Sequence, residues 1–235
     1  MVINKYLGEF FGTFILVGLG SMGILSALAF GGAESVPFII SVGLGFGLAL
    51  LAGIWAVGHL TGAHFNPAVT LAALLDKRIG FGDAVGYWVA QFAGATVGSL
   101  LLLAISDSAA VAMTTTTYTD LTTAIFTEVT LTAVFVWVIL AVTKRGENHA
   151  PLAIALTLVA VHVAGIPFSG ASVNPARSFG PAVVAGEVGS RLGVYIYAPL
   201  IGAVIAWGLY RLFSVEETDA PAKTMPPAET APPSV

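Results

Sequence analysis

Six long runs of apolar residues decide most of what this chain can fold into. They span about 7–29, 37–58, 83–105, 121–143, 150–166 and 193–214. Each run is close to the ~20 residues that a helix needs to cross the ~30 Å hydrocarbon core of a bilayer. Continuous apolar runs favour helices, because the strands of a membrane barrel alternate polar and apolar positions. The pattern predicts an all-α membrane protein with six transmembrane helices.

The composition agrees with a chain dissolved largely in lipid. Of its 235 residues, 57% are hydrophobic and only 9% are charged, whereas a soluble domain carries roughly 25% charged residues. The net charge of −4 offers no basic surface for nucleic acid. The chain has no cysteine, and its sequence contains no metal-ligand cluster, nucleophile–base set or phosphate-binding loop. We therefore expect neither an enzyme nor a bound metal or other cofactor.

The first run follows Lys5 and resembles a secretion signal, but it is longer than the 7–15 apolar residues of such a signal. We expect it to remain as a helix. Basic residues then set the orientation, since they gather on one side of a six-helix topology: Lys5, Lys77, Arg78, Lys144, Arg145, Arg211 and Lys223. By the positive-inside rule, both termini are cytoplasmic, in the plasma membrane or the inner membrane of a bacterium.

Two further apolar pieces, 58–76 and 165–186, are too short and too rich in Gly and Pro to cross the membrane alone. Each contains Asn-Pro-Ala, at Asn66, Pro67 and Ala68 and again at Asn174, Pro175 and Ala176. Asn is a preferred N-cap and Pro suits the first helical position. From Asn66 to Leu75 such a helix is ~15 Å long, about half the membrane. We expect two re-entrant half-helices that enter from opposite faces and meet near the midplane.

The two halves of the chain, about 5–105 and 121–213, repeat each other. Besides the Asn-Pro-Ala segments, Tyr87 matches Tyr195, and the pair Glu9 and Thr13 matches Glu128 and Thr132. Three spans per half is an odd number, so the second half lies inverted in the membrane relative to the first. Inverted repeats of this kind place the functional site at their interface. We expect one channel domain over 1–215, followed by a disordered cytoplasmic tail over 216–235 that is rich in Pro and Ala; a docking role for this tail is the alternative.

The paired Asn-Pro-Ala motifs, the second extended as "NPARS", and the Glu-x-x-x-Thr pattern in each half resemble the aquaporin (major intrinsic protein) family. The resemblance covers the chain from about Lys5 to Phe213. It implies a homotetramer in the lipid bilayer, with one pore through each subunit and water as the permeating molecule.

The resemblance also implies a selectivity filter at Phe46, His162, Ala171 and Arg177. Phe46 and His162 together resemble the water-selective branch. Two residues depart from that branch: Ala171 is smaller and less polar than the usual Thr or Cys, and Ile196 stands where Trp is common. Both departures leave room for a minor second solute.

Physical roles can be assigned to the polar filter residues. A charge inside the membrane is expensive, so Arg177 should face a wet pore, donate to passing water and repel cations; an ion pair with Glu128 is the alternative. His162 should offer a second polar contact, and Phe46 should form the opposite wall. The alternatives are a hydrogen-bonded structural histidine and an ordinary core phenylalanine.

The half-helices bring further polar groups to the midplane. Each N-terminus carries roughly +0.5 elementary charge, which disfavours cations and hydronium there. The amides of Asn66 and Asn174 can hold a water oxygen and interrupt proton relay. We expect Glu9 and Glu128 to be structural buried acids that bind unwound loop backbone, with proton transfer as the alternative. His59 and His64 either line the inner vestibule, where they could sense pH, or simply pack in the loop.

The sequence therefore predicts a passive water channel that excludes protons and ions. One alternative is a channel that also passes small neutral solutes such as glycerol. A second is an ion-coupled secondary transporter, because transporters share inverted repeats and broken helices.

Overall fold

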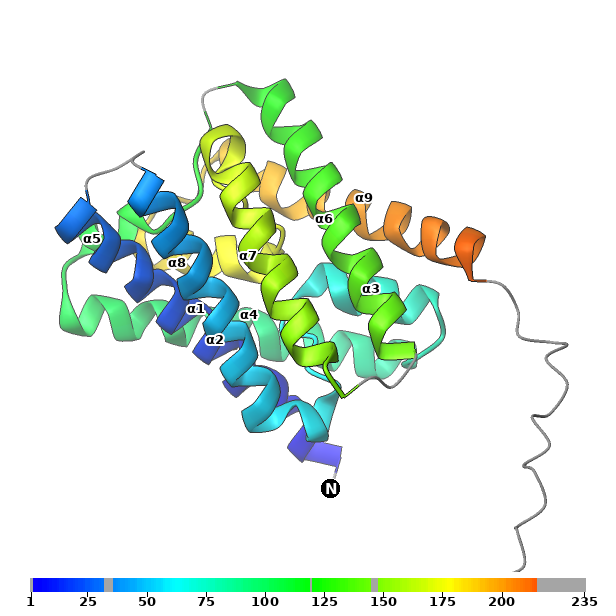
Figure 1. Ribbon diagram of the computed structural model, residues 1–235. Coiled ribbons are helices and arrows are strands. Elements are labelled where there is room, and N and C mark those ends of the chain that lie inside the picture. The colour runs from blue at the N-terminus through cyan, green and yellow to red at the C-terminus, as the bar shows by residue number, and fades with distance from the viewer. Residues whose placement is uncertain (1, 32–35, 119, 145–147, 215–235) are drawn as a thin grey trace, which may run out of the picture.

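The computed structural model describes residues 2–31, 36–118, 120–144 and 148–214, and all regular structure within them is helical (Figure 1). The helices are α1 (Val2–Gly31), α2 (Val36–Thr61), α3 (Pro67–Leu75), α4 (Phe81–Ile105), α5 (Ser108–Met113), α6 (Leu121–Lys144), α7 (Ala150–Ser169), α8 (Pro175–Ala185) and α9 (Ser190–Phe213). Six of them, α1, α2, α4, α6, α7 and α9, are long and apolar enough to cross a membrane. The prediction of six spans is thus confirmed, while the tail over 216–235 lies outside the described residues.

The structure differs from the expected segments in two places. The run expected to end at 166 continues through Pro167 to Ser169 and stops at Gly170, whose φ is 77°. A proline near the end of a helix removes one hydrogen bond without preventing the last turn. The connection over 106–120 also contains the short helix α5, capped by Asp107, whose side chain accepts a hydrogen bond from the Ala110 N–H.

The two half-helices begin at the Asn-Pro steps. The side-chain oxygen of Asn66 accepts from the Ala68 N–H at 2.8 Å, and that of Asn174 accepts from the Ala176 N–H at 3.0 Å. These bonds satisfy donors that a helix N-terminus otherwise leaves free. With 9 residues in α3 and 11 in α8, neither helix is long enough to cross a bilayer.

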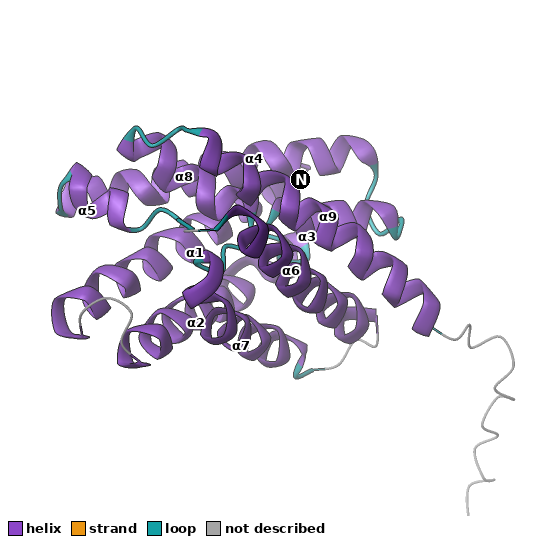
Figure 2. Cartoon of the chain, turned by 90° about the horizontal axis from the view of Figure 1, so that it is seen from above, coloured by secondary structure: helices purple, strands orange, loops and turns teal. Residues whose placement is uncertain are grey.

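The two halves pack in the same way. Helix α1 packs against α2 and α4, and correspondingly α6 packs against α7 and α9. Helices α2 and α7 lie side by side and join the halves (Figure 2). Each half-helix is enclosed by spans from both halves, because α3 contacts α4, α6 and α9 while α8 contacts α1, α4 and α9.

Glycines allow the closest helix crossings. A Cβ at Gly94 of α4 would lie 2.2 Å from the Phe10 carbonyl oxygen of α1, and one at Gly202 of α9 would lie 2.6 Å from the Val129 carbonyl oxygen of α6. These crossings occupy equivalent places in the two halves. Small residues at such contacts let helix backbones approach each other inside a membrane.

We predict that Gly94→Ala lowers the thermal stability of the protein in detergent, because its methyl group meets a backbone carbonyl rather than a movable side chain. Overpacking of this kind costs about 1–3 kcal/mol. Gly208→Ala is the matched control, since no other group lies within 4 Å of a Cβ placed there. Thermal unfolding followed by circular dichroism should separate the two variants, and equal melting temperatures would contradict the assigned contact.

Candidate functional site

The two loops that lead into the half-helices are joined to each other by the asparagines. The Asn66 Nδ2 donates to the Val173 carbonyl oxygen at 2.8 Å, and the Asn174 Nδ2 donates to the Phe65 carbonyl oxygen at 2.9 Å. Each asparagine thus caps its own helix with its oxygen and binds the opposite loop with its nitrogen. The N-termini of α3 and α8 are therefore held against one another.

Each of these two asparagines has a side-chain N–H group that is not used in the bonds between the loops. A side-chain amide nitrogen carries two N–H donors, and each of these nitrogens makes one bond to the opposite loop. Both Asn66 and Asn174 line an internal cavity. One N–H from each is therefore available to a molecule inside that cavity.

The backbone of both loops adopts a left-handed conformation at the same three positions. The φ values are 83°, 56° and 47° at Gly62, Ala63 and Phe65, and 77°, 49° and 46° at Gly170, Ala171 and Val173. For a residue other than glycine, this conformation costs about 1–3 kcal/mol. Contacts with the surrounding helices must stabilise it.

Glu9 of α1 supplies such contacts to the first loop. Its Oε1 accepts from the His64 N–H at 3.0 Å, and its Oε2 accepts from the Phe65 N–H at 2.7 Å. The Gln91 Nε2 donates to the same Oε2 at 2.7 Å. Glu9 is completely buried, so the carboxyl replaces the water that would otherwise bind these amides.

Glu128 of α6 does the same for the second loop. Its Oε1 accepts from the Ser172 N–H at 2.8 Å and from the Ser169 hydroxyl at 2.7 Å, and its Oε2 accepts from the Val173 N–H at 2.8 Å. Glu128 is also completely buried. Its two oxygens are thus occupied by the loop.

Phe46 of α2, His162 of α7 and Arg177 of α8 meet at one place. The rings of Phe46 and His162 stack with centroids 4.9 Å apart and planes 14° from parallel. The Arg177 guanidinium carbon lies 4.6 Å from the centroid of the Phe46 ring. All three side chains are at least 97% buried, with exposed fractions of 1%, 1% and 3%. They form a tight constriction with one apolar and two polar members.

The polar atoms of the constriction are only partly bonded to the protein. The Arg177 Nη1 donates to the Thr114 carbonyl oxygen at 3.2 Å, and within the described residues Arg177 forms no ion pair with Glu128. The His162 Nδ1 lies 2.9 Å from the Leu158 carbonyl oxygen; a carbonyl only accepts, so Nδ1 carries the proton. Within the same part of the chain, the Arg177 Nε and the His162 Nε2 have no partner. A neutral His162 therefore presents an acceptor where Arg177 presents a donor.

A cavity of about 110 Å³ connects this constriction with the asparagines. Its lining includes Asn66, Asn174, Phe46, His162, Arg177, His64, Thr143 and Pro151. Most of the lining side chains are apolar, as is usual for a solute site with few orienting groups. Of the other predicted residues, His59 is exposed and lies off the cavity, whereas Ala171 is buried and precedes the lining residue Ser172.

Residues 1–210 match a sequence model described as Major intrinsic protein. The chain is a member of the major intrinsic protein family. Membership makes it a multi-pass integral membrane channel, and the family consists of channels rather than enzymes.

Relatives of this major intrinsic protein include several kinds of channel. It is 38% identical to glycerol uptake facilitator protein-like 6 of Lactiplantibacillus plantarum over 92% of this chain and 100% of that protein. It is 35% identical to aquaporin TIP2-1 of Zea mays over 88% of this chain and 86% of that one. Among solved structures, the aquaglyceroporin from Plasmodium falciparum matches with a TM-score of 0.76 at 26% identity, covering 91% of this chain and 95% of the other.

The connection over 106–120 of this family member contributes a contact that sequence reasoning missed. The Ser172 hydroxyl donates to the Asn174 carbonyl oxygen at 3.0 Å, so the Ser178 hydroxyl must donate to Ser172. The Thr116 hydroxyl lies 2.6 Å from that of Ser178 and can in turn donate to it. This chain of hydroxyls connects the Thr-rich segment to the start of α8. The run of threonines over 114–117 was the only signal of it in the sequence.

We predict that Glu128→Gln destabilises the protein and reduces conduction. Glutamine offers one acceptor oxygen, and its NH₂ group would face a loop N–H that then has no partner. A buried unsatisfied group costs about 1–3 kcal/mol. Glu187→Gln removes an exposed carboxylate and is the control. Thermal unfolding and solute flux should both change in the first variant alone; a fully stable and active Glu128→Gln protein would show that the loop needs no second acceptor.

Proposed function

We propose that this channel conducts water passively and excludes protons and ions. The observation that carries the proposal is the meeting of Phe46, His162 and Arg177. Contacts this close between large side chains favour a passage that admits water more readily than a larger solute. Phe46, His162 and Arg177 then form the selectivity filter, with Ala171 as its fourth member.

The unpartnered atoms of the filter suit a water molecule. A buried polar atom without a partner is costly, and Arg177 Nε and His162 Nε2 are both in this state within the described residues. Water can accept from Arg177 and donate to neutral His162. Each passing water thus replaces part of the hydration that it loses on entry.

Two features of the proposed channel exclude ions: the positive charge of Arg177 and the half-helix N-termini that meet near the membrane midplane. The Arg177 guanidinium repels cations at the constriction. Beyond it, the opposed N-termini of α3 and α8 carry roughly +0.5 elementary charge each. The free N–H groups of Asn66 and Asn174 hold a water oxygen so that its hydrogens point outward, which interrupts proton relay. In this proposal Glu9 and Glu128 are structural, because their oxygens already accept bonds from loop amides.

Glycerol conduction is the second candidate, and the names of two relatives favour it. One relative is called a glycerol uptake facilitator-like protein, and one solved structure is an aquaglyceroporin. The small side chain of Ala171 adds space near the filter. The aromatic Phe46 and the imidazole of His162 favour water over glycerol.

The proposal extends to the membrane and the assembly. We propose a homotetramer in the plasma membrane, or in the inner membrane of a bacterium, with both termini cytoplasmic. The charge distribution supports this orientation. Large exposed apolar side chains, such as Trp55, Phe126 and Leu156, offer surfaces for neighbouring subunits and lipid. We further propose one channel domain over 1–215, built from inverted repeats, and a cytoplasmic tail over 216–235.

We predict that vesicles containing the protein pass water rapidly and glycerol far more slowly, with flux that rises linearly with the gradient. Stopped-flow light scattering measures both solutes, and a pH-sensitive dye inside the vesicles detects proton leakage. Phe46→Ala combined with His162→Ala should raise glycerol flux at least tenfold, because two large filter side chains are lost. Glycerol flux equal to water flux in the parent protein would replace the water-selective proposal with the glycerol one, and saturable, ion-dependent flux would indicate a transporter.

We also predict that Ala171→Cys makes water flux sensitive to mercurials. The parent has no cysteine and should resist them. A thiol at the filter binds mercury, which then obstructs the path, and a reducing thiol should reverse the inhibition. Ala63→Cys is the matched variant, because Ala63 holds the equivalent place in the first loop and lines the cavity. Complete labelling of Ala171→Cys without loss of flux would remove Ala171 from the filter.

A further inference from the structure

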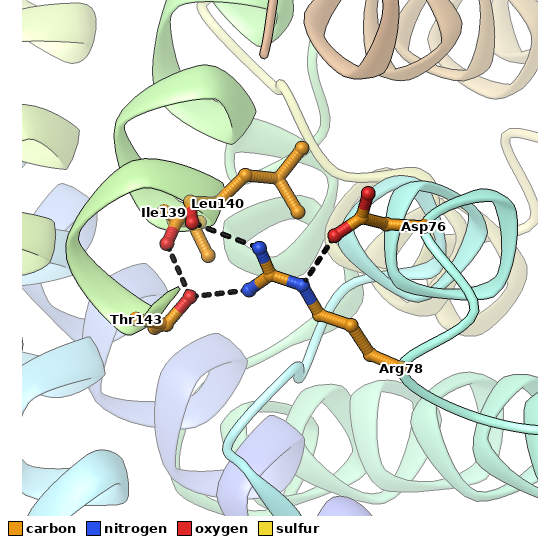
Figure 3. Close-up of polar contacts among 5 residues, drawn as sticks. All are labelled: Asp76, Arg78, Ile139, Leu140 and Thr143. Carbon is orange, nitrogen blue, oxygen red and sulfur yellow. Dashed lines mark hydrogen bonds and ion pairs between the residues drawn. The ribbon is translucent and has the colours of Figure 1, made fainter. Parts of the chain in front are cut away.

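A polar cluster lies at the end of the bundle where α6 and α9 terminate, outside the site described above. Arg78, in the connection between α3 and α4, is at its centre (Figure 3). Its Nε donates to the Asp76 Oδ2 at 2.8 Å, its Nη1 donates to the Thr143 hydroxyl at 2.6 Å, and its Nη2 donates to the Leu140 carbonyl oxygen at 2.9 Å. The Thr143 hydroxyl donates in turn to the Ile139 carbonyl oxygen. Arg78 therefore ties the half-helix connection to the end of α6.

Arg78 retains donors after making these bonds. A guanidinium carries five N–H groups in a planar fork, and three of them are used. One N–H on each terminal nitrogen is left. The side chain is 26% exposed, and its guanidinium carbon lies 5.3 Å from the centroid of the Tyr210 ring. The guanidinium is thus held in a fixed position, and two of its N–H groups remain unbonded to the described part of the protein.

Two more cations surround the same space. A cavity of about 300 Å³ is lined by Asp76, Arg78, Thr143, Lys144, Tyr210 and Arg211. Lys144 and Arg211 form no ion pair within the part of the chain that the structure describes. Asp76 is the single acid of the lining, and its carboxylate is already bound by Arg78. The cavity therefore carries excess positive charge from three separate elements.

The surroundings of this cavity are apolar and exposed. Leu212 and Phe213, next to Arg211 on α9, are 74% and 63% exposed. The Phe213 ring stacks on Trp137 of α6 with centroids 5.4 Å apart. Both α6 and α9 are membrane spans that end here, so the cavity lies where hydrocarbon gives way to headgroups. Aromatic side chains are enriched at this level of a membrane.

We propose that this cavity binds the phosphodiester headgroup of an anionic glycerophospholipid, whose acyl chains lie along Leu212 and Phe213. The spare N–H groups of Arg78 lie on different terminal nitrogens, and one of them can donate a charge-assisted hydrogen bond to a free oxygen of a phosphodiester. Lys144 and Arg211 supply the additional charge that favours an anionic over a zwitterionic headgroup. A soluble phosphate would use the same donors but not the apolar surface beside them.

Lipid binding at this place has a consequence for the channel. Thr143 lines both this cavity and the channel cavity, and its hydroxyl is held by Arg78. A bound lipid therefore stabilises the end of α6 that forms part of the channel wall. This role is independent of which solute the channel conducts.

The test uses the full chain in phosphatidylcholine bilayers that contain a fixed fraction of either brominated phosphatidylglycerol or brominated phosphatidylcholine, since a brominated lipid quenches tryptophan fluorescence on contact. Trp137 lies beside the proposed acyl surface. The parent should bind phosphatidylglycerol in preference to phosphatidylcholine. The double variant Lys144→Gln, Arg211→Gln should lose about fivefold of this preference for each cation removed. It leaves Arg78 and its structural bonds in place.

Arg191→Gln is the matched control, because it removes an exposed arginine near the start of α9, at the far end of that helix. It should retain the preference of the parent. Equal quenching by both lipids in the parent, or an unchanged preference in a double variant that keeps the parent's melting temperature, would overturn the proposal. Abolition of the preference by millimolar inorganic phosphate at constant ionic strength would also overturn it, by identifying a soluble anion as the ligand.

Discussion

Backbone amides inside hydrocarbon must find partners within the protein, and the arrangement of this channel depends on that requirement. Two loops enter the membrane in a non-helical conformation, so the usual helical bonds are missing there. Glu9 and Glu128 replace them, each with two oxygens directed at consecutive loop amides. The left-handed residues before each half-helix are thereby held, and these residues set where the asparagines lie. The two buried acids thus hold the loops that lead into the half-helices.

The constriction depends on elements that are distant in the sequence. Phe46 comes from α2, His162 from α7 and Arg177 from α8. The connection over 106–120 completes the arrangement, because the Thr114 carbonyl accepts from the guanidinium and Thr116 begins the chain of hydroxyls through Ser178. Two spans, a half-helix and a surface connection therefore position these three side chains. The connection over 106–120 thus contacts Arg177 directly through a hydrogen bond.

Much of this fold could be predicted from the sequence, since span length and the Asn-Pro step are local signals. The repeat of Glu9 at Glu128 and of Asn66 at Asn174 then indicated how the halves correspond. Contacts that depend on three-dimensional proximity had no such signal. The bond between Arg177 and a Thr114 carbonyl involves a backbone atom, which every residue type possesses. The extension of α7 through Pro167 was missed because proline argues locally against helix. The short helix α5 was missed because six residues are too few to show a helical period.

The crossed bonds of the two asparagines have a mechanical consequence. Asn66 holds the second loop and Asn174 holds the first, and both bonds are buried. Any rocking of one half against the other would have to break these two buried bonds together. The two halves are therefore held rigidly together where the half-helices meet. In the proposed channel, a solute would cross this rigid path under its own gradient, and the protein would need neither to store nor to release energy in each passage.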